Sequence, residues 1–304
     1  MAGTTPPAKK MKTGEAVLDG RIHDPIPTFD MEDIYDTKLV KIVVGNPDRH
    51  HKTFSVSREQ VCAHSTYFAA AFKKDFKEAH EKTIAIQQFA PEFFAIFLTF
   101  IHTFDITFNW HSHTAGIPDT KDPTTWYYRV LVECYVLGDY IGARAFRDRI
   151  LETIQIKLMQ HKKMPSGEAI RAAYNGTPEN SQLRKVLVDG TCARQMRSAD
   201  IRHHYNDREG PPMQFMADCQ YRMSKLAAAL ACAHCSPLSS CDHTCDSKYH
   251  TREDAMVGML STWCKYHEHE TEEQKELCKW KVRALKKRLD QESGEGGDNN
   301  DEDD

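Results

Sequence analysis

The chain lacks the features that define membrane and secreted proteins. It contains no apolar run that approaches the roughly 20 residues a helix needs to span a bilayer. Its first residues also lack the apolar core of a secretory signal. We therefore expect no membrane partner, and we expect the 10 cysteines to be reduced thiols or metal ligands rather than a disulfide framework. A formal net charge of −4 implies no general affinity for nucleic acid.

The motifs of common enzyme classes are missing as well. The sequence has no phosphate-binding glycine loop, no Gly-x-Ser-x-Gly turn and no His-Glu-x-x-His helix. Acids, histidines and thiols are plentiful, but none has a spacing that assigns catalytic roles. We predict that the protein is not an enzyme, and we assign no catalytic residue.

Three short stretches near the start of the chain have the pattern of β-strands. Residues 39–45 form a β-branched run that ends in a turn, and residues 52–57 alternate polar and apolar side chains. Because only a few residues separate these runs, a hairpin is the simplest connection between them. Residues 83–86 are predicted to form a third strand.

Apolar spacing predicts helices between and after these strands. Residues 93–101 are apolar nearly all round and follow Pro91, which suits the first turn of a helix. A helix without a polar face must be buried on several sides. One further apolar stripe is predicted to consist of Tyr67, Phe68, Ala71, Phe72 and Phe76.

Six segments carry a family resemblance. They read FSV at 54–56, STYF at 65–68, FKEA at 76–79, IAI at 84–86, LVECYVLGDY at 131–140 and YNGTPENSQLR at 174–184. In this order and spacing they resemble the BTB/POZ domain, most closely the variety found in filamentous fungi. The resemblance covers about half of the chain, roughly residues 35 to 190.

The resemblance implies an α+β fold and a function in protein interaction. The expected fold is a BTB/POZ fold, with a short three-stranded sheet and surrounding helices, followed by an all-helical C-terminal extension. Such domains form homo- or hetero-oligomers, homodimers included, and present a surface to partner proteins. Some members hand substrates to cullin-type ubiquitin ligases. That role would place a cullin against the helix at 93–101 and the helices at 124–158.

The pattern divides the chain into six parts. We predict a disordered N-terminal tail at 1–34, the BTB/POZ domain at 35–160, a helical extension at 161–231, a Cys/His-rich segment at 232–269, a basic amphipathic helix at 270–289 and a disordered acidic tail at 290–304. The two tails lack a periodic apolar pattern that could offset their ordering entropy. A long loop is expected at 105–122.

One helix of the extension is predicted in more detail. Thr177 precedes a proline and an acid, which is the pattern of an N-cap and first turn. Leu183 and Leu187 belong to the apolar stripe of this helix, and Arg184 and Lys185 are expected on a solvated face.

The N-terminal tail holds a short basic cluster. Lys9, Lys10 and Lys12 have the form of a monopartite nuclear import signal, and the alternative is a solvated basic tail. Such short matches arise often by chance. We expect the protein in the nucleus or the cytoplasm, with the nucleus slightly favoured by these three lysines.

A candidate zinc site lies further along the chain. Two close thiol pairs, Cys232 with Cys235 and Cys241 with Cys245, could bind one tetrahedral ion. Only the first pair has standard spacing, and His234 and His243 are substitutes within the pairs. Because the pairs are close together, one pair could instead join ligands further on, namely His250, Cys264, His267 or Cys278. Reduced thiols without a metal are the alternative.

The C-terminal basic helix leaves three functions open. Its narrow apolar seam of Cys278, Val282, Leu285 and Leu289 could dock on the domain, pair with a partner helix or contact nucleic acid. Intramolecular docking is the commonest outcome for one short amphipathic helix. The leading hypothesis is a protein-interaction module that mediates oligomerisation and partner recruitment, with a cullin adaptor as one version of it. The alternatives are a nuclear transcription or chromatin regulator that uses a zinc-binding Cys/His cluster, and an oligomerising scaffold.

Overall fold

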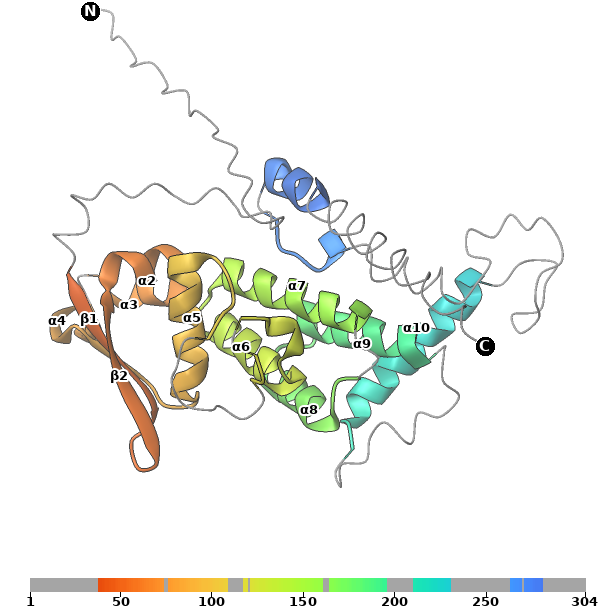
Figure 1. The fold of residues 1–304 in the computed structure, drawn as a ribbon, viewed down its shortest axis with the longest axis horizontal. Coiled ribbons are helices and arrows are strands. Elements are labelled where there is room, and N and C mark those ends of the chain that lie inside the picture. Colours follow the sequence, from red (N-terminus) through yellow and green to blue (C-terminus); the bar gives the residue numbers. More distant parts are fainter. Residues whose placement is uncertain are drawn as a thin grey trace, which may run out of the picture.

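The computed structural model describes most of the first 195 residues and parts of the C-terminal half. The described residues are 38–73, 76–108, 117–119, 121–160, 164–195, 210–230, 263–269 and 271–280. A small sheet lies at one end, and helices extend away from it (Figure 1). Among the helices of these residues, none is long and apolar enough to cross a membrane.

The sheet consists of three strands in the order β2-β1-β3. Strand β1 (Leu39–Asn46) pairs antiparallel with β2 (His50–Ser57) and parallel with β3 (Thr83–Ile86). Gly45 leads into the hairpin turn with φ of +104°, and a Cβ atom there would lie 2.2 Å from the His50 carbonyl oxygen. Only glycine fits this close approach. The three predicted strands and the hairpin are confirmed.

Four helices surround the sheet. They are α2 (Arg58–His64), α3 (Thr66–Ala71), α4 (Lys77–Glu81) and α5 (Pro91–Thr103). Ser57 and Ser65 cap α2 and α3 by accepting hydrogen bonds from the backbone N–H groups of Gln60 and Phe68. The predicted stripe was wrong at Phe76, which lies beyond α3 and is 51% exposed. Helix α3 ends at Ala71, so the helical spacing does not continue to Phe76.

Helix α5 joins the sheet to the helical half of the protein. It begins at Pro91, as predicted, and buries Phe94, Ile96, Phe97, Phe100 and Ile101. The rings of Phe97 and Phe100 lie 5.5 and 5.3 Å from that of Phe146 in α7 (Arg144–Gln160). The prediction that this helix is buried on several sides is confirmed.

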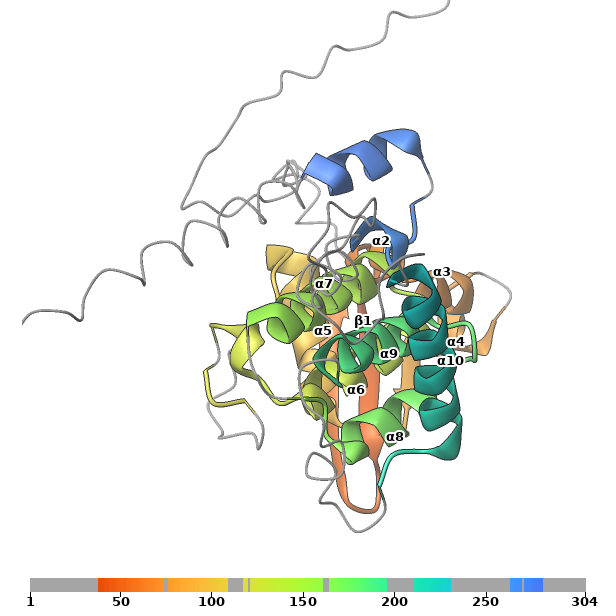
Figure 2. The same cartoon turned by 90° about the vertical axis from the view of Figure 1, so that its right-hand side faces the viewer.

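The second half of the described structure is helical. Its elements are η1 (Pro123–Thr125), α6 (Tyr128–Tyr140), α7 (Arg144–Gln160), α8 (Gly167–Gly176), α9 (Gln182–Gln195), α10 (Met213–Leu230), η3 (Trp263–Lys265) and a helix at 272–280. One hydrophobic core runs from Val40 in β1 to Tyr266 without interruption. Figures 1 and 2 both show the described C-terminal residues on the α7 side of the molecule, away from α8.

The structure corrects the predicted helix start at Thr177. Helix α9 begins at Gln182, and Thr177 instead closes α8 by donating its hydroxyl to the Ala173 carbonyl at 2.6 Å. The solvated face predicted for Arg184 was wrong too. Its guanidinium is buried, donates to the Tyr174 carbonyl at 2.6 Å and lies 4.4 Å from the centre of the Tyr174 ring. Lys185 is exposed, as expected.

The loop predicted at 105–122 begins inside the core. Ile106 and Phe108 are buried, and Asp105 forms an ion pair with Arg149 at 3.0 Å. The described parts of this segment form neither helix nor strand before η1. The predicted tails at 1–34 and 290–304 lie outside the described residues.

Candidate functional site

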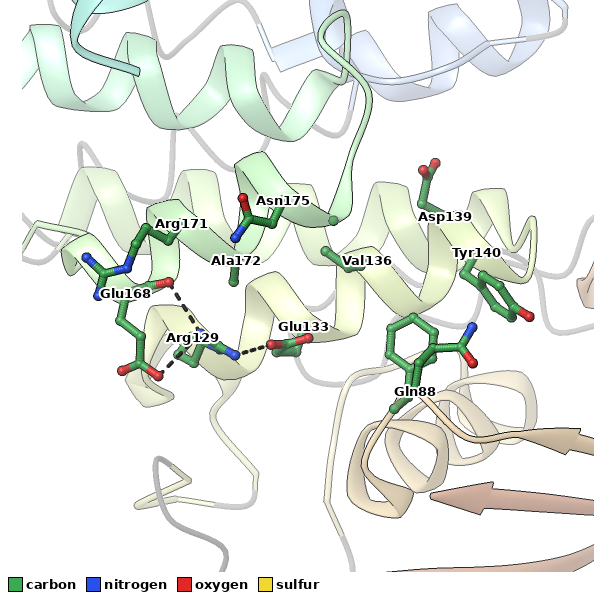
Figure 3. A pocket seen from close by; sticks show the side chains of 12 residues that line it. Gln88, Arg129, Glu133, Val136, Asp139, Tyr140, Glu168, Arg171, Ala172 and Asn175 are labelled. Atoms are coloured by element: carbon green, nitrogen blue, oxygen red, sulfur yellow. Dashed lines mark hydrogen bonds and ion pairs between the residues drawn. The ribbon is translucent and has the colours of Figure 1, made fainter. Parts of the chain in front are cut away.

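A broad groove crosses the junction between the BTB-like half (β1 to α5) and the helical half (η1 onward). It has a volume of about 1000 Å³ and lies between the segment after β3, helix α6 and helix α8. Its lining residues are Gln88, Phe89, Arg129, Glu133, Val136, Asp139, Tyr140, Glu168, Arg171, Ala172, Asn175 and Gly176. The groove is wide and open to solvent (Figure 3).

Packing of α8 on α6 forms the floor of this groove. Ser166 caps α8 by accepting a hydrogen bond from the Ala169 N–H at 3.2 Å, which fixes where the helix begins. Gly176 lies at the last position of α8, where a Cβ atom would be 2.6 Å from Val136 in α6. The absence of a side chain at Gly176 therefore lets the two helices approach closely.

Charged side chains line one end of the groove. Arg129 reaches from α6 to Glu133 in the same helix and to Glu168 in α8, with the second ion pair at 3.2 Å (Figure 3). The Glu168 side chain is 62% exposed, so its ion pair with Arg129 contributes little to stability, whereas Glu133 is only 19% exposed. These side chains give the groove a mixed-charge wall that a partner's polar side chains could contact.

Aromatic side chains line the opposite end. The Tyr140 ring lies 5.4 Å from Phe89 and 5.5 Å from Tyr67, and Tyr140 itself is 44% exposed. Burial, followed by the neighbouring Tyr140 hydroxyl, raises the pKa of Tyr67 to about 12. The Tyr67 hydroxyl therefore stays neutral at physiological pH and can donate a hydrogen bond. Aromatic side chains are enriched at protein interfaces, so a groove with exposed aromatic residues at one end and charged residues at the other has the chemistry of a protein-binding surface.

A second polar centre connects the C-terminal segment to the helical half. Asp189 in α9 is almost fully buried and accepts hydrogen bonds from Arg222 in α10, from Lys265 at 2.8 Å and from the Tyr266 hydroxyl. Burial raises the pKa of Tyr266, and the Asp189 carboxylate adds to that effect. Three donors thus converge on one carboxylate. This arrangement fixes residues 265–266 against α9 and α10.

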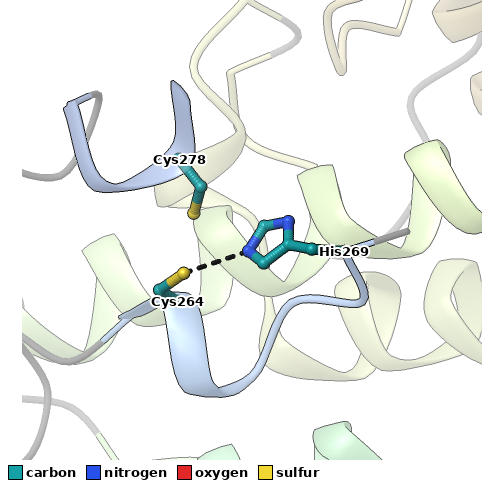
Figure 4. A group of neighbouring side chains, drawn as sticks. All are labelled: Cys264, His269 and Cys278. Atoms are coloured by element: carbon teal, nitrogen blue, oxygen red, sulfur yellow. Dashed lines mark hydrogen bonds between the residues drawn. The ribbon is translucent and has the colours of Figure 1, made fainter. Parts of the chain in front are cut away.

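A Cys/His cluster lies directly beside this anchored segment. The ligand atoms of Cys264, His269 and Cys278 all lie within 4.8 Å of one another. The Cys264 sulfur is 3.1 Å from Nε2 of His269, and the Cys278 sulfur is 3.1 Å from Nδ1 of His267. Figure 4 shows both sulfur atoms directed toward the His269 ring. Burial lowers the pKa of His269, with further lowering from nearby Arg144 and Lys275.

The residues named from the sequence fall into two groups. Cys232, Cys235, Cys241 and Cys245, with His234, His243 and His250, lie outside the described residues, so the predicted four-cysteine site stays a prediction. Among the more distant ligands considered for one pair, the structure brings Cys264 and Cys278 together and places His267 against Cys278. His269 was missed. Its signal was the local Cys-x-x-His-x-His spacing from Cys264.

Comparison with known protein families supports the reading of the first half. Residues 35–117 match the BTB/POZ domain, and the three-stranded sheet with its helices fits that match. The chain therefore contains a BTB/POZ domain followed by a helical C-terminal region. No curated protein matches the sequence. A BTB/POZ domain is a protein-interaction module, which is the general class of function that these residues define. The likeness to the fungal variety and a domain end at residue 160 stay predictions.

Proposed function

We propose that the protein is an adaptor that recruits partner proteins to a cullin-type ubiquitin ligase. The observation that carries this proposal is the continuity of the BTB/POZ domain with helices α6 and α7 in one core. The resemblance assigns the cullin to the surface of α5 and of the helices that follow.

The exposed positions on the proposed cullin surface are few. Helix α5 is mostly buried and exposes His102 and Thr103 at its C-terminal end. Tyr127, directly before α6, is 66% exposed. A large aromatic side chain without neighbours covering it is the residue type that protein interfaces most often use as an anchor. These positions can be changed without disturbing the core.

The test is direct binding between the purified full-length chain and a purified cullin from the same organism. We expect binding by calorimetry, and a loss of at least about tenfold in affinity for the double variant His102→Glu, Tyr127→Ala, equivalent to roughly 1.4 kcal/mol. Met213→Ser is the matched control, because Met213 is 84% exposed on the distant helix α10. Absence of binding by the folded wild-type chain would reject the adaptor proposal.

A nuclear transcription or chromatin regulator is the second candidate. The observation that favours it is the gathering of Cys264, His269 and Cys278, because this function requires a metal-binding C-terminal half. It also requires nuclear import. A fluorescent fusion of the full chain should enter the nucleus, and replacing Lys9, Lys10 and Lys12 by alanine should keep it in the cytoplasm. A wild-type fusion confined to the cytoplasm would reject this candidate.

A further inference from the structure

We propose that Cys264, His267, His269 and Cys278 form a structural zinc site that closes the C-terminal segment onto helix α7. The four side chains come from two adjacent pieces of chain. Three belong to residues 264–269, and Cys278 belongs to the helix at 272–280. Metal binding here would be independent of whether a cullin or chromatin is the partner.

Three of the four side chains already lie close together, and the fourth contacts one of them. Zinc binds thiolate sulfur at about 2.3 Å and imidazole nitrogen at about 2.0–2.1 Å, so neighbouring sulfur and nitrogen ligands lie about 3.5 Å apart around a tetrahedral centre. Both sulfur–nitrogen contacts in the cluster are 3.1 Å, and Cys264, His269 and Cys278 converge within 4.8 Å. Cys264, His269 and Cys278 therefore lie close enough to share one ion, and His267, which contacts Cys278, would turn its ring to become the fourth ligand.

The donor set indicates which metal is bound. Two thiolates and two imidazoles are the ligands of closed, four-coordinate zinc sites, whereas calcium and magnesium require oxygen ligands. Two thiolates balance the charge of a divalent ion, so the loaded site would be neutral. A closed set of protein ligands leaves no position for a substrate, so the role is structural.

The surroundings show what the ion would hold in place. Arg147 in α7 forms an ion pair with Glu268 at 2.8 Å, between the two histidines. Arg144 in α7 donates to Gln274 at 2.9 Å in the C-terminal helix. Lys265 and Tyr266, directly after Cys264, bind Asp189. Each contact attaches one side of the cluster to the helical half, and zinc would join the two sides to each other.

The first test is metal content and cobalt spectroscopy of the full-length chain. We expect one zinc ion per chain that is lost in the double variant Cys264→Ser, Cys278→Ser and retained in Cys232→Ser, Cys235→Ser. Cobalt(II) in the same site should show tetrahedral d–d bands and thiolate charge transfer, which the first variant loses. Retention of all the zinc by the Cys264→Ser, Cys278→Ser variant would overturn the proposal. Loss of the same ion in both variants would overturn the proposed ligand set.

The second test needs no substitution and holds even if a variant fails to fold. Native protein is treated with a maleimide, with and without a chelator, and modified cysteines are identified by mass spectrometry. We expect zinc to protect Cys264 and Cys278, and the chelator to raise their modification at least about tenfold. Half-buried Cys62 and buried Cys134 are controls, because neither belongs to the proposed ligand set and neither should respond to the chelator. Equal modification of Cys264 with and without chelator would overturn the proposal.

Discussion

At the scale of single residues, Asp148 makes the clearest prediction about pH. This carboxylate lies in α7 and accepts a hydrogen bond from the Glu268 N–H at 3.5 Å. Burial raises its pKa from 3.8 to about 7. The Glu268 hydrogen bond and the positive charges of Arg144 and Arg147 only partly offset that effect, and the Glu268 carboxylate adds to it. The folded protein therefore keeps a proton that the unfolded chain releases at lower pH.

Stability should fall as pH rises because of Asp148. One pKa unit corresponds to about 1.4 kcal/mol, so between pH 5.5 and 8 the folded state should lose roughly 2 kcal/mol relative to the variant Asp148→Asn. Urea unfolding of both proteins at the two pH values measures this difference. Any pH-dependent change in stability that comes from the nearby Cys/His cluster cancels, because both proteins contain it. Glu276→Gln, at an exposed position, should show no such trend. A pH-independent difference between wild type and Asp148→Asn would contradict the shifted pKa.

Asp189 makes a prediction about buried charge. Replacing it by alanine leaves Arg222, Lys265 and the Tyr266 hydroxyl without their shared acceptor. The expected cost is about 2–3 kcal/mol, less than for a fully buried pair because Arg222 and Lys265 are about a third exposed. Thermal or urea unfolding measures it. Glu272→Ala, which breaks only an exposed pair with Lys275, should change stability by less than about 0.5 kcal/mol.

Single residues also show where sequence reasoning stops. Arg184 resembles any surface arginine in the sequence, but the fold places it beneath the α8–α9 turn, where carbonyl oxygens and a tyrosine ring neutralise the cost of burial. His269 could have been found from its spacing, but Cys278 becomes its neighbour only through the fold of residues 264–278. The local sequence pattern predicts whether a residue belongs to a helix, a strand or a candidate ligand set. Long-range packing decides which side chains it contacts.

At the scale of elements, the crossing of α7 and α9 depends on one glycine. A Cβ atom at Gly190 would lie 2.6 Å from Cδ1 of Leu158, which is fully buried. In Gly190→Ala, overpacking should destabilise the protein by about 1–3 kcal/mol. The higher helix propensity of alanine should offset about 1 kcal/mol of that cost. In a Leu158→Ala background the clash disappears, and the same substitution should become neutral or stabilising. Urea unfolding of the four proteins gives the coupling energy. An equal cost in both backgrounds would contradict this account of the crossing.

The elements themselves could largely be predicted from sequence. The sequence shows those features that depend only on residues close together in the chain. Examples are the strand alternation, the helix start at Pro91 and the all-apolar pattern of α5. The start of α9 was misplaced because Thr177 has two competing uses. It could cap the next helix, but its hydroxyl closes the preceding one instead. Both uses satisfy backbone groups equally well, and only the packing of α8 decides between them.

At the scale of the whole molecule, residues up to the end of α7 share one core with helices α8 to α10. The inner face of α7 contributes Ile150, Ile154 and Leu158, all fully buried, and α9 covers Leu158 from the other side. A boundary at residue 160 would cut directly through this contact. The sequence could not indicate this, because the apolar positions of α7 look the same whether they cover the sheet side or another helix.

A chain that ends at residue 160 should therefore not fold cooperatively. Removal of α8 and α9 would expose the α7 side chains that they cover, and each large apolar side chain returned to water costs about 1.5–3 kcal/mol. That loss is comparable to the whole stability of a small domain. We expect residues 1–160 to aggregate or to melt without a sharp transition, and residues 1–230, which keep α8 to α10, to melt cooperatively. Differential scanning calorimetry distinguishes the two. A sharp, reversible transition for residues 1–160 would show instead that these residues are an independent domain and that helices α8 to α10 are attached to it only at the surface.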